Sequence, residues 1–179
     1  MDKSRLTYIP LSIDGVLALS LDSRADERGT LYRIWEKSEV FKNFNVVEMS
    51  FVKNPQINTL RGLHFQNKPF TENKIIYCIE GQVYDVIFDL RIESDTYFQH
   101  LAIDIGPKSK FQGIYIPAGC AHGYLTRSRN TFLIYLMDTG YSAIHASGIR
   151  WNDPKLQIEW PYQPEVISKR DENWPLILD

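Results

Sequence analysis

Two histidines in this sequence stand beside glycines in apolar surroundings, where an imidazole can be held against a ligand. His64 lies in the segment Arg-Gly-Leu-His-Phe-Gln, and His122 lies in the segment Pro-Ala-Gly-Cys-Ala-His-Gly. Lys74 comes between them in the chain and Tyr135 follows them. Side chains of these types move protons or stabilise developing negative charge. Because no serine or cysteine has a comparable setting, the pattern favours proton transfer over covalent catalysis.

Segments with the alternating apolar pattern of β-strands must position these side chains. They are residues 16–21, 29–35, 45–52, 59–66, 74–80, 83–89, 97–104, 111–117 and 131–138. Short strands separated by turns at this spacing are typical of a β-sandwich or barrel. The glycine turn at residues 80–82 predicts that 74–89 form a β-hairpin. Residues 37–44 are the best candidate for a short helix.

Two details of the pattern predict local structure. Arg61 and His64 have opposite parity, so a regular strand would place them on opposite faces. If both serve one pocket, Gly62 marks a β-bulge between them.

Beyond Trp151 the chain carries four prolines, and we expect this tail to wrap the barrel with little regular structure. His100 and His145 lie in no such motif and are interpreted as surface residues.

Length and composition exclude several classes of protein. The 179 residues fit one domain, with hydrophobic and charged contents of 44% and 23% that are typical of globular proteins. A net charge of −2 with mixed signs offers no basic face for nucleic acid or anionic lipid. No apolar run approaches the roughly 20 residues of a membrane span, and no signal sequence is recognisable at the N-terminus. Two cysteines make neither a disulfide framework nor a zinc pattern, so the cytoplasm is the default location.

The order and spacing of several motifs resemble the dTDP-4-dehydrorhamnose 3,5-epimerase family, cupin enzymes that epimerise nucleotide-linked 4-keto-6-deoxy sugars. The matching segments are residues 26–29 (Asp-Glu-Arg-Gly), 61–66, 81–86 with 89–91, 117–123, 148–154 (Gly-Ile-Arg-Trp-Asn-Asp-Pro) and 158–161 (Ile-Glu-Trp-Pro). The resemblance implies one domain over residues 1–179 with an all-β, cupin-type jelly roll and few short helices. It also implies a homodimer with swapped N-terminal strands and no cofactor.

The resemblance further assigns catalytic roles. His64 would be the base, oriented by Asp171, Lys74 would stabilise the enolate oxygen, and Tyr135 would be the acid on the opposite sugar face. Each residue has a simpler interpretation as well. His64 fits a core histidine satisfied by a backbone carbonyl, and Asp171 fits a solvated charge run. Lys74 fits a charge that protects a strand edge, and Tyr135 fits plain core.

Substrate contacts are implied at Arg61, His122, Arg28 and Gln66, although His122 also fits a structural turn. Two of the positions at which the sequence departs from the family pattern concern the nucleotide base. Arg33 stands where the family has a glutamate that helps to hold the base, and Glu48 stands where it has a glutamine. Glu48 and Arg33 would either recognise a different base, such as the cytosine of a CDP-sugar, or form a charge-swapped pair with thymine retained.

The second ligand of the metal-binding cupin motif, His-x-His, is missing because His64 is followed by Phe65 and Gln66. We therefore expect no metal. The sequence predicts an epimerase that inverts C3, C5 or both of a nucleoside-diphosphate 4-keto-6-deoxyhexose. The alternatives are a nucleotide-sugar 3,4-ketoisomerase of related fold and a non-catalytic sugar- or nucleotide-binding cupin.

Overall fold

A computed structural model describes residues 6–21 and 23–177, which form fourteen strands and one helix. The first strands are β1 (Leu6–Pro10), β2 (Leu17–Leu21), β3 (Ser23–Asp26), β4 (Gly29–Tyr32), β5 (Glu48–Asn54), β6 (Thr59–Gln66) and β7 (Lys74–Glu80). They are followed by β8 (Val83–Asp89), β9 (His100–Ile105), β10 (Gly113–Ile116), β11 (Cys120–Thr126), β12 (Thr131–Met137), β13 (Ala146–Gly148), β14 (Val166–Ile167) and the helix α1 (Lys169–Glu172).

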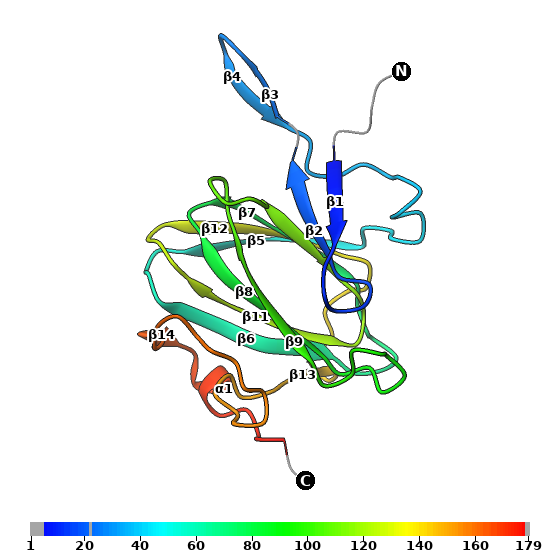
Figure 1. Cartoon of the computed structure of the whole chain (residues 1–179), viewed down its shortest axis with the longest axis vertical. Helices are drawn as coiled ribbons and strands as arrows, with labels where there is room; N and C mark the ends of the chain where they lie inside the picture. Colours follow the sequence, from blue (N-terminus) through cyan, green and yellow to red (C-terminus); the bar gives the residue numbers. More distant parts are fainter. Residues whose placement is uncertain (1–5, 22, 178–179) are drawn as a thin grey trace.

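Two sheets face each other and form a β-sandwich, as the sequence predicted. One has the order β1-β2-β10-β7-β12-β5, and the other has the order β13-β6-β11-β8-β9. Neighbouring strands are antiparallel, and the short β14 adds to β6 in parallel. In Figure 1 the hairpin β3–β4 projects from the top of the sandwich, whereas α1 and the C-terminal segment lie at the bottom. The long sequence separations between paired strands are those of a jelly roll.

Three hydrophobic clusters bury both faces of each sheet. The central cluster lies between the sheets and includes Ile76 of β7, Ile87 of β8 and Leu133 of β12. The loop between β4 and β5 covers the outer face of the first sheet with Phe41 and Phe44. The C-terminal tail covers the outer face of the second sheet. Because the central strands have buried side chains on both faces, they appear in the sequence as nearly continuous apolar runs.

The predicted helix over residues 37–44 is wrong. This segment forms turns, in which Phe41 and Phe44 pack against Tyr115 of β10 with ring centroids 5.4 and 6.1 Å apart. Trp35 packs on the same two phenylalanines. Three aromatic anchors on a short segment fix the backbone by tertiary contacts, which override the weak helical pattern.

One expectation about strand pairing is also corrected by the structure. Residues 74–89 are not a hairpin, because β7 pairs with β10 and β12 whereas β8 pairs with β9 and β11. The turn at Gly81, with φ of +80°, therefore connects the two sheets. His122, which also fitted a structural turn, lies within a strand, because β11 begins at Cys120. The expected tail is confirmed, because between Trp151 and Ile177 only β14 and α1 interrupt its irregular course.

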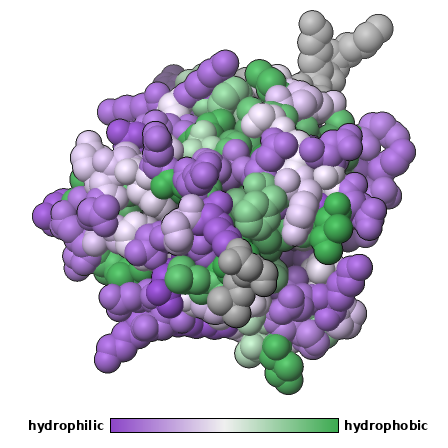
Figure 2. Space-filling view, turned by 60° about the horizontal axis from the view of Figure 1, so that its bottom comes forward, coloured by the Kyte–Doolittle hydropathy of each residue, from purple (hydrophilic) through white to green (hydrophobic). Residues whose placement is uncertain are grey.

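The described residues contain no helix that is long and apolar enough to cross a membrane. Figure 2 shows the face at the C-terminal end of the molecule, where hydrophobic residues are interspersed among hydrophilic ones. His100 and His145, expected at the surface, are both partly buried, and His145 stacks on Phe70 at a centroid distance of 4.5 Å.

Candidate active site

A cavity of about 360 Å³ opens between the two sheets and gathers most of the predicted site residues. Seven of the ten line it, namely Arg61, His64, Gln66, Lys74, His122, Tyr135 and Glu48. They come from β5, β7 and β12 of one sheet and from β6 and β11 of the other. The side chains that the sequence singled out for proton chemistry thus share one cavity.

Strand alternation explains how the first sheet supplies its part of the cavity. Along β7, Lys74 has the same parity as Ile76 and Cys78, which enter the central core. Along β12, Tyr135 has the same parity as the core residue Leu133. Lys74 and Tyr135 therefore continue the core-facing rows at the end of the sandwich where the cavity opens.

The predicted bulge on β6 is confirmed and brings Arg61 and His64 into the same cavity. Opposite β11, His122 pairs with His64 but Tyr124 pairs with Arg61, so three steps on β6 match two on β11. Gly62 has φ of +120°, and a Cβ there would lie 2.5 Å from the Cα of Gly123. Only glycine permits this close approach of the two backbones.

His64 forms a close pair with Asp171, the aspartate predicted to orient it. Its Nε2 lies 2.6 Å from Asp171 Oδ1, and the imidazole is 45% exposed whereas the carboxylate is 6% exposed. Burial alone would raise the pKa of Asp171, but hydrogen bonds from His64, the Gly62 amide and Trp174 lower it below the usual value. An ionised Asp171 fixes the proton of His64 on Nε2, which leaves the lone pair of Nδ1 available.

Local structure at α1 holds Asp171 behind His64. Ser168 caps the helix, and its hydroxyl accepts a hydrogen bond of 3.0 Å from the Asp171 amide. β14 ties the preceding residues to β6, the strand that carries His64. A residue from the C-terminal tail is thereby placed in contact with a residue 107 positions earlier.

His122 forms a second histidine–aspartate pair, which lies deeper than the first. Its Nε2 is 2.8 Å from Oδ2 of Asp85 on the neighbouring strand β8, and both side chains are buried. Burial raises the pKa of Asp85, whereas the interactions with His122 and Lys74 oppose that shift. Asp85 Oδ1 is buried without a hydrogen-bond partner among the described residues.

Lys74 is nearly buried and pairs with the carboxylate of Glu72, which lines the same cavity. Its Nζ lies 2.7 Å from Glu72 Oε1, with exposures of 7% and 13% for the two side chains. The other oxygen of Glu72 accepts from the amide of Gln66. The Gln66 amide also accepts from the backbone N–H of Ser142 at 2.7 Å. Gln66 therefore fixes Glu72 and the loop after β12, in addition to lining the cavity.

Tyr135 presents a phenol that stays protonated. Burial raises its pKa well above the usual value, and nearby Tyr124 and Asp85 add to that effect. Its hydroxyl is hydrogen-bonded to Tyr124, whose own hydroxyl lies 3.3 Å from Asn54 Oδ1. Arg61 Nε donates to the same Asn54 oxygen at 3.0 Å. This network connects the phenol on one sheet with the guanidinium on the other.

Two predicted substrate contacts, Arg28 and Arg33, do not line the cavity of their own chain. Arg28 lies at the exposed hairpin β3–β4 and pairs with Asp26. Arg33 pairs with Glu36 at 2.8 Å. Glu48 does line the cavity, where its Oε2 accepts from the Tyr141 amide at 2.8 Å. Glu48 and Arg33 are therefore engaged with other partners within the chain.

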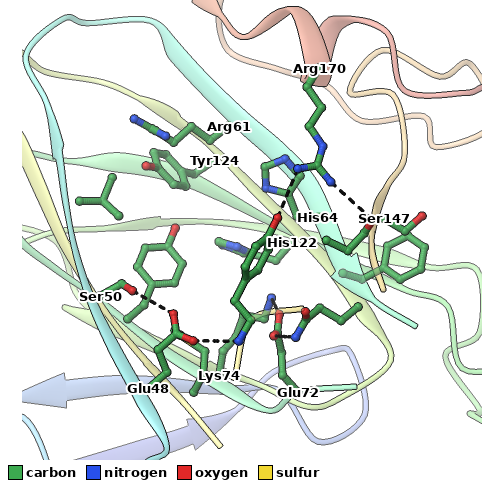
Figure 3. Close-up of a pocket in the computed structure, with 17 residues that line it drawn as sticks. Glu48, Ser50, Arg61, His64, Glu72, Lys74, His122, Tyr124, Ser147 and Arg170 are labelled. Atoms are coloured by element: carbon green, nitrogen blue, oxygen red, sulfur yellow. Dashed lines mark hydrogen bonds and ion pairs between the residues drawn. The ribbon is translucent and has the colours of Figure 1, made fainter. Parts of the chain in front are cut away.

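Two residues that line the cavity, Arg170 and Glu72, were not predicted from the sequence, and neither was Asp85, the buried partner of His122. Figure 3 shows Arg170 reaching from α1 toward the cavity on the side opposite Glu48 and Ser50. Its guanidinium lies 3.4 Å from the Tyr141 hydroxyl. Asp85 had a detectable signal, because a lone aspartate within an apolar strand needs a buried partner. Arg170 and Glu72 lie in segments with no strand pattern, so strand alternation could not predict which way their side chains point.

No group of three or more histidine, cysteine, aspartate or glutamate side chains is arranged to hold a metal ion among residues 6–21 and 23–177. The two close His–Asp pairs instead give each imidazole a carboxylate partner on Nε2. This arrangement suits proton transfer through the remaining ring nitrogen.

Comparison with known proteins adds independent findings. The family model described as dTDP-4-dehydrorhamnose 3,5-epimerase matches residues 10–179. A dTDP-4-dehydrorhamnose 3,5-epimerase of Sinorhizobium fredii is 35% identical over 152 residues, which cover 79% of this chain and 77% of the relative.

Two solved structures are similar over nearly their whole length. The dTDP-4-dehydrorhamnose 3,5-epimerase of Bacillus anthracis with TDP and PPi bound superposes with a TM-score of 0.89 and 31% identity, covering 96% of this chain and 99% of the other. The dTDP-6-deoxy-D-glucose-3,5-epimerase of Legionella pneumophila in complex with dTDP-4-keto-L-rhamnose gives a TM-score of 0.88 and 27% identity, covering 96% and 92%.

Proposed function

We propose that this chain, which belongs to the dTDP-4-dehydrorhamnose 3,5-epimerase family, is a single-domain epimerase. Its substrate would be a nucleoside-diphosphate 4-keto-6-deoxyhexose in deoxysugar biosynthesis. The reaction inverts C3, C5 or both through an enolate. One observation carries this proposal: His64 and Tyr135 line the same cavity from opposite sheets. Inversion requires a base on one face of the sugar and an acid on the other.

His64 is the base of the proposed mechanism. A C–H bond next to the C4 carbonyl is acidic enough for a neutral imidazole to remove its proton when the two are held in contact. Nδ1 carries the free lone pair, because Nε2 is bound to Asp171 at 2.6 Å. Asp171 then stabilises the imidazolium that forms, as a buried carboxylate does in other histidine-based catalysts.

Lys74 stabilises the enolate oxygen. Its ammonium has three N–H groups, and Glu72 accepts one of them at 2.7 Å. The remaining donors are available to the C4 oxygen of a sugar in the cavity. A cation fixed in a nearly buried position stabilises the developing charge strongly, since little solvent screens it.

Tyr135 returns a proton to the opposite face. Its raised pKa keeps the phenol protonated at neutral pH, so it can act as a donor. The hydrogen bond to Tyr124 connects the phenol to a network that extends to Arg61. Protonation from the face opposite to His64 inverts the carbon, whereas return of the proton by His64 restores the original configuration.

Arg61 and Arg170 are proposed to bind the diphosphate. Both line the cavity, one from β6 and one from α1. Only the Nε of Arg61 binds Asn54, so its terminal nitrogens can fork onto a phosphate. The TDP bound to the Bacillus anthracis relative supports dTDP as the nucleotide. Glu48 is already bound to the Tyr141 amide, so it would support the loop after β12 rather than select another base.

Solvent exchange tests the proposed reaction. In deuterated water the protein should introduce deuterium at C3, C5 or both of dTDP-4-keto-6-deoxyglucose, and NMR identifies the positions. Accumulation of a 3-keto product would favour the ketoisomerase alternative. Tight binding with exchange at neither carbon would contradict catalysis and favour the non-catalytic alternative.

We also propose a homodimer in which the hairpin β3–β4 completes the site of the partner. Every residue of this hairpin is exposed, including Leu31 at 62% and Tyr32 at 53%. The edge strand β5 exposes Met49 and Phe51 at 66% and 61%, which gives a second copy an apolar surface to cover. Arg28 and Arg33 would then serve the other chain's cavity.

Subunit complementation tests the shared site. Arg28→Ala and His64→Asn should each be nearly inactive alone. An equal mixture, unfolded and refolded together, should recover about a quarter of wild-type activity, since half of the dimers are mixed and each has one intact site. If the mixture stays as inactive as its components, Arg28 does not act across a dimer.

The location and cofactor requirement follow from the same proposal. The reaction moves only protons, so the side chains described above suffice without a cofactor. Both cysteines, Cys78 and Cys120, are free and buried. Free thiols fit a reducing compartment, and we propose the cytoplasm.

A further inference from the structure

We propose that Trp174, which follows α1 in the C-terminal tail, is a positioning residue that sets the basicity of His64 through Asp171. This inference rests on the proposed role of His64 as the base. The carrying observation is that two donors, the His64 imidazole and the Trp174 indole, converge on one oxygen of a buried carboxylate.

The geometry at Asp171 is specific. Trp174 Nε1 donates to Asp171 Oδ1 at 3.2 Å, and His64 Nε2 lies 2.6 Å from the same oxygen. The indole also meets the His64 ring edge to face, with centroids 6.2 Å apart at 70°. Trp174 therefore contacts both members of the pair, and it holds the carboxylate in the orientation that His64 requires.

The packing around Trp174 is built for a large ring. Gly148 of β13 lies against the indole, and a Cβ at this position would be 2.3 Å from a ring carbon. Arg150 Nε donates to the Trp174 carbonyl at 2.8 Å and fixes the backbone. The indole thus has a defined position, with no side chain at 148 to displace it.

Because Trp174 and His64 share Asp171 Oδ1, the direction in which Trp174 changes the basicity of His64 can be predicted. A second donor on Oδ1 withdraws part of the carboxylate charge from His64, because that charge is divided between two hydrogen bonds. The protonated imidazole is then stabilised less than it would be by a carboxylate bound to His64 alone. Removal of the indole N–H should shift the acidic limb of the activity profile to higher pH.

Four other titratable or charged groups lie near the His64–Asp171 pair. They are Arg61 on β6, His122 on β11, Arg170 on α1 and Arg150 after β13. Arg170 lies over the face of the indole at 4.8 Å from its centroid, so Trp174 also supports this proposed phosphate contact. The N–H and the ring face act on different partners, and substitutions can separate them.

Trp174→Phe removes the N–H and keeps an aromatic face for Arg170 and Gly148. The midpoint of the acidic limb in the pH profile of kcat/KM, measured by solvent deuterium exchange, should shift about half a pH unit higher. Exchange at pH values below this midpoint should be about threefold slower than in the wild type. KM should change less than about twofold. Trp174→Leu should shift the limb equally and also raise KM, because Arg170 loses its ring.

Trp160→Phe is the matched control. It removes an indole N–H of the same tail, which donates to the Trp151 carbonyl at 2.9 Å and does not contact Asp171. This variant should leave the pH profile unchanged. An unshifted profile in Trp174→Phe, or an equal shift in Trp160→Phe, would overturn the positioning role.

A substrate-free measurement separates this inference from the proposed function. In NMR spectra the indole N–H of Trp174 should resonate downfield, as expected for a bond to a carboxylate, and Asp171→Asn should move it upfield. An unchanged indole signal in Asp171→Asn would overturn the inference even if the enzyme is active or if Trp174→Phe fails to fold. A shifted signal in a protein that exchanges no substrate proton would instead refute the proposed function alone.

Discussion

His64→Asn should slow deuterium exchange into the sugar by about 10²–10⁴-fold, the usual effect of removing a positioned general base. The nearly buried Lys74 would still polarise the carbonyl, but no neutral imidazole would stand on that face. Nucleotide affinity should be nearly unchanged, because the proposed phosphate contacts lie on other residues. Exchange rates from NMR and calorimetric titration with dTDP measure the two quantities.

His100→Asn provides the control for this substitution. His100 is a partly buried histidine on β9 and does not line the cavity. Its replacement should leave the exchange rate within about twofold, as is usual away from a site. A His64→Asn variant that kept more than about a tenth of wild-type turnover would mean that His64 is structural.

Tyr135→Phe should separate exchange from inversion. The ring keeps its contact with His122, where the centroids are 6.2 Å apart, and only the hydroxyl is lost. His64 should still remove the proton and return deuterium to the same face, so exchange continues. Net inversion should fall by about 100-fold or more, since its acid is missing.

Tyr84→Phe is the matched control, because the Tyr84 hydroxyl bonds to the Glu159 carbonyl outside the cavity. It should preserve both exchange and inversion. Loss of exchange together with inversion in Tyr135→Phe would contradict the assignment of the acid, and would indicate that the hydroxyl positions the substrate.

Strand parity accounts for what the sequence predicted well. The opposite parity of Arg61 and His64 predicted the irregularity that β6 shows at Gly62, whereas the roles of Lys74 and Tyr135 came from the family resemblance. Parity depends only on neighbours in the chain, so a single sequence is sufficient to apply it.

Pairing across the fold accounts for what the sequence did not predict. The turn at Gly81 has the composition of a hairpin, yet its two strands enter different sheets. Sheet membership depends on which distant strands compete for each edge, which a local turn motif does not specify. For the same reason the pairing of His122 with Asp85, 37 residues away, could not be assigned from the sequence.

The C-terminal tail illustrates both cases. Asp171 was predicted only through the family resemblance, whereas Arg170 and Trp174 beside it were missed. All three act from a segment in which α1 spans only Lys169–Glu172. Their positions follow from contacts with β6 and β13, and a segment without periodicity gives no indication of such contacts.

In the proposed mechanism the sugar lies between a base on one sheet and an acid on the other. A crystal structure of the double variant His64→Asn/Tyr135→Phe with dTDP-4-keto-6-deoxyglucose tests it most directly, because this variant should bind the substrate without converting it. We expect the sugar ring between positions 64 and 135, which should face opposite sides of the ring, with the C4 oxygen about 2.7–3.2 Å from Lys74 Nζ. A sugar with both positions on one face, or bound outside this cavity, would refute the proposed mechanism.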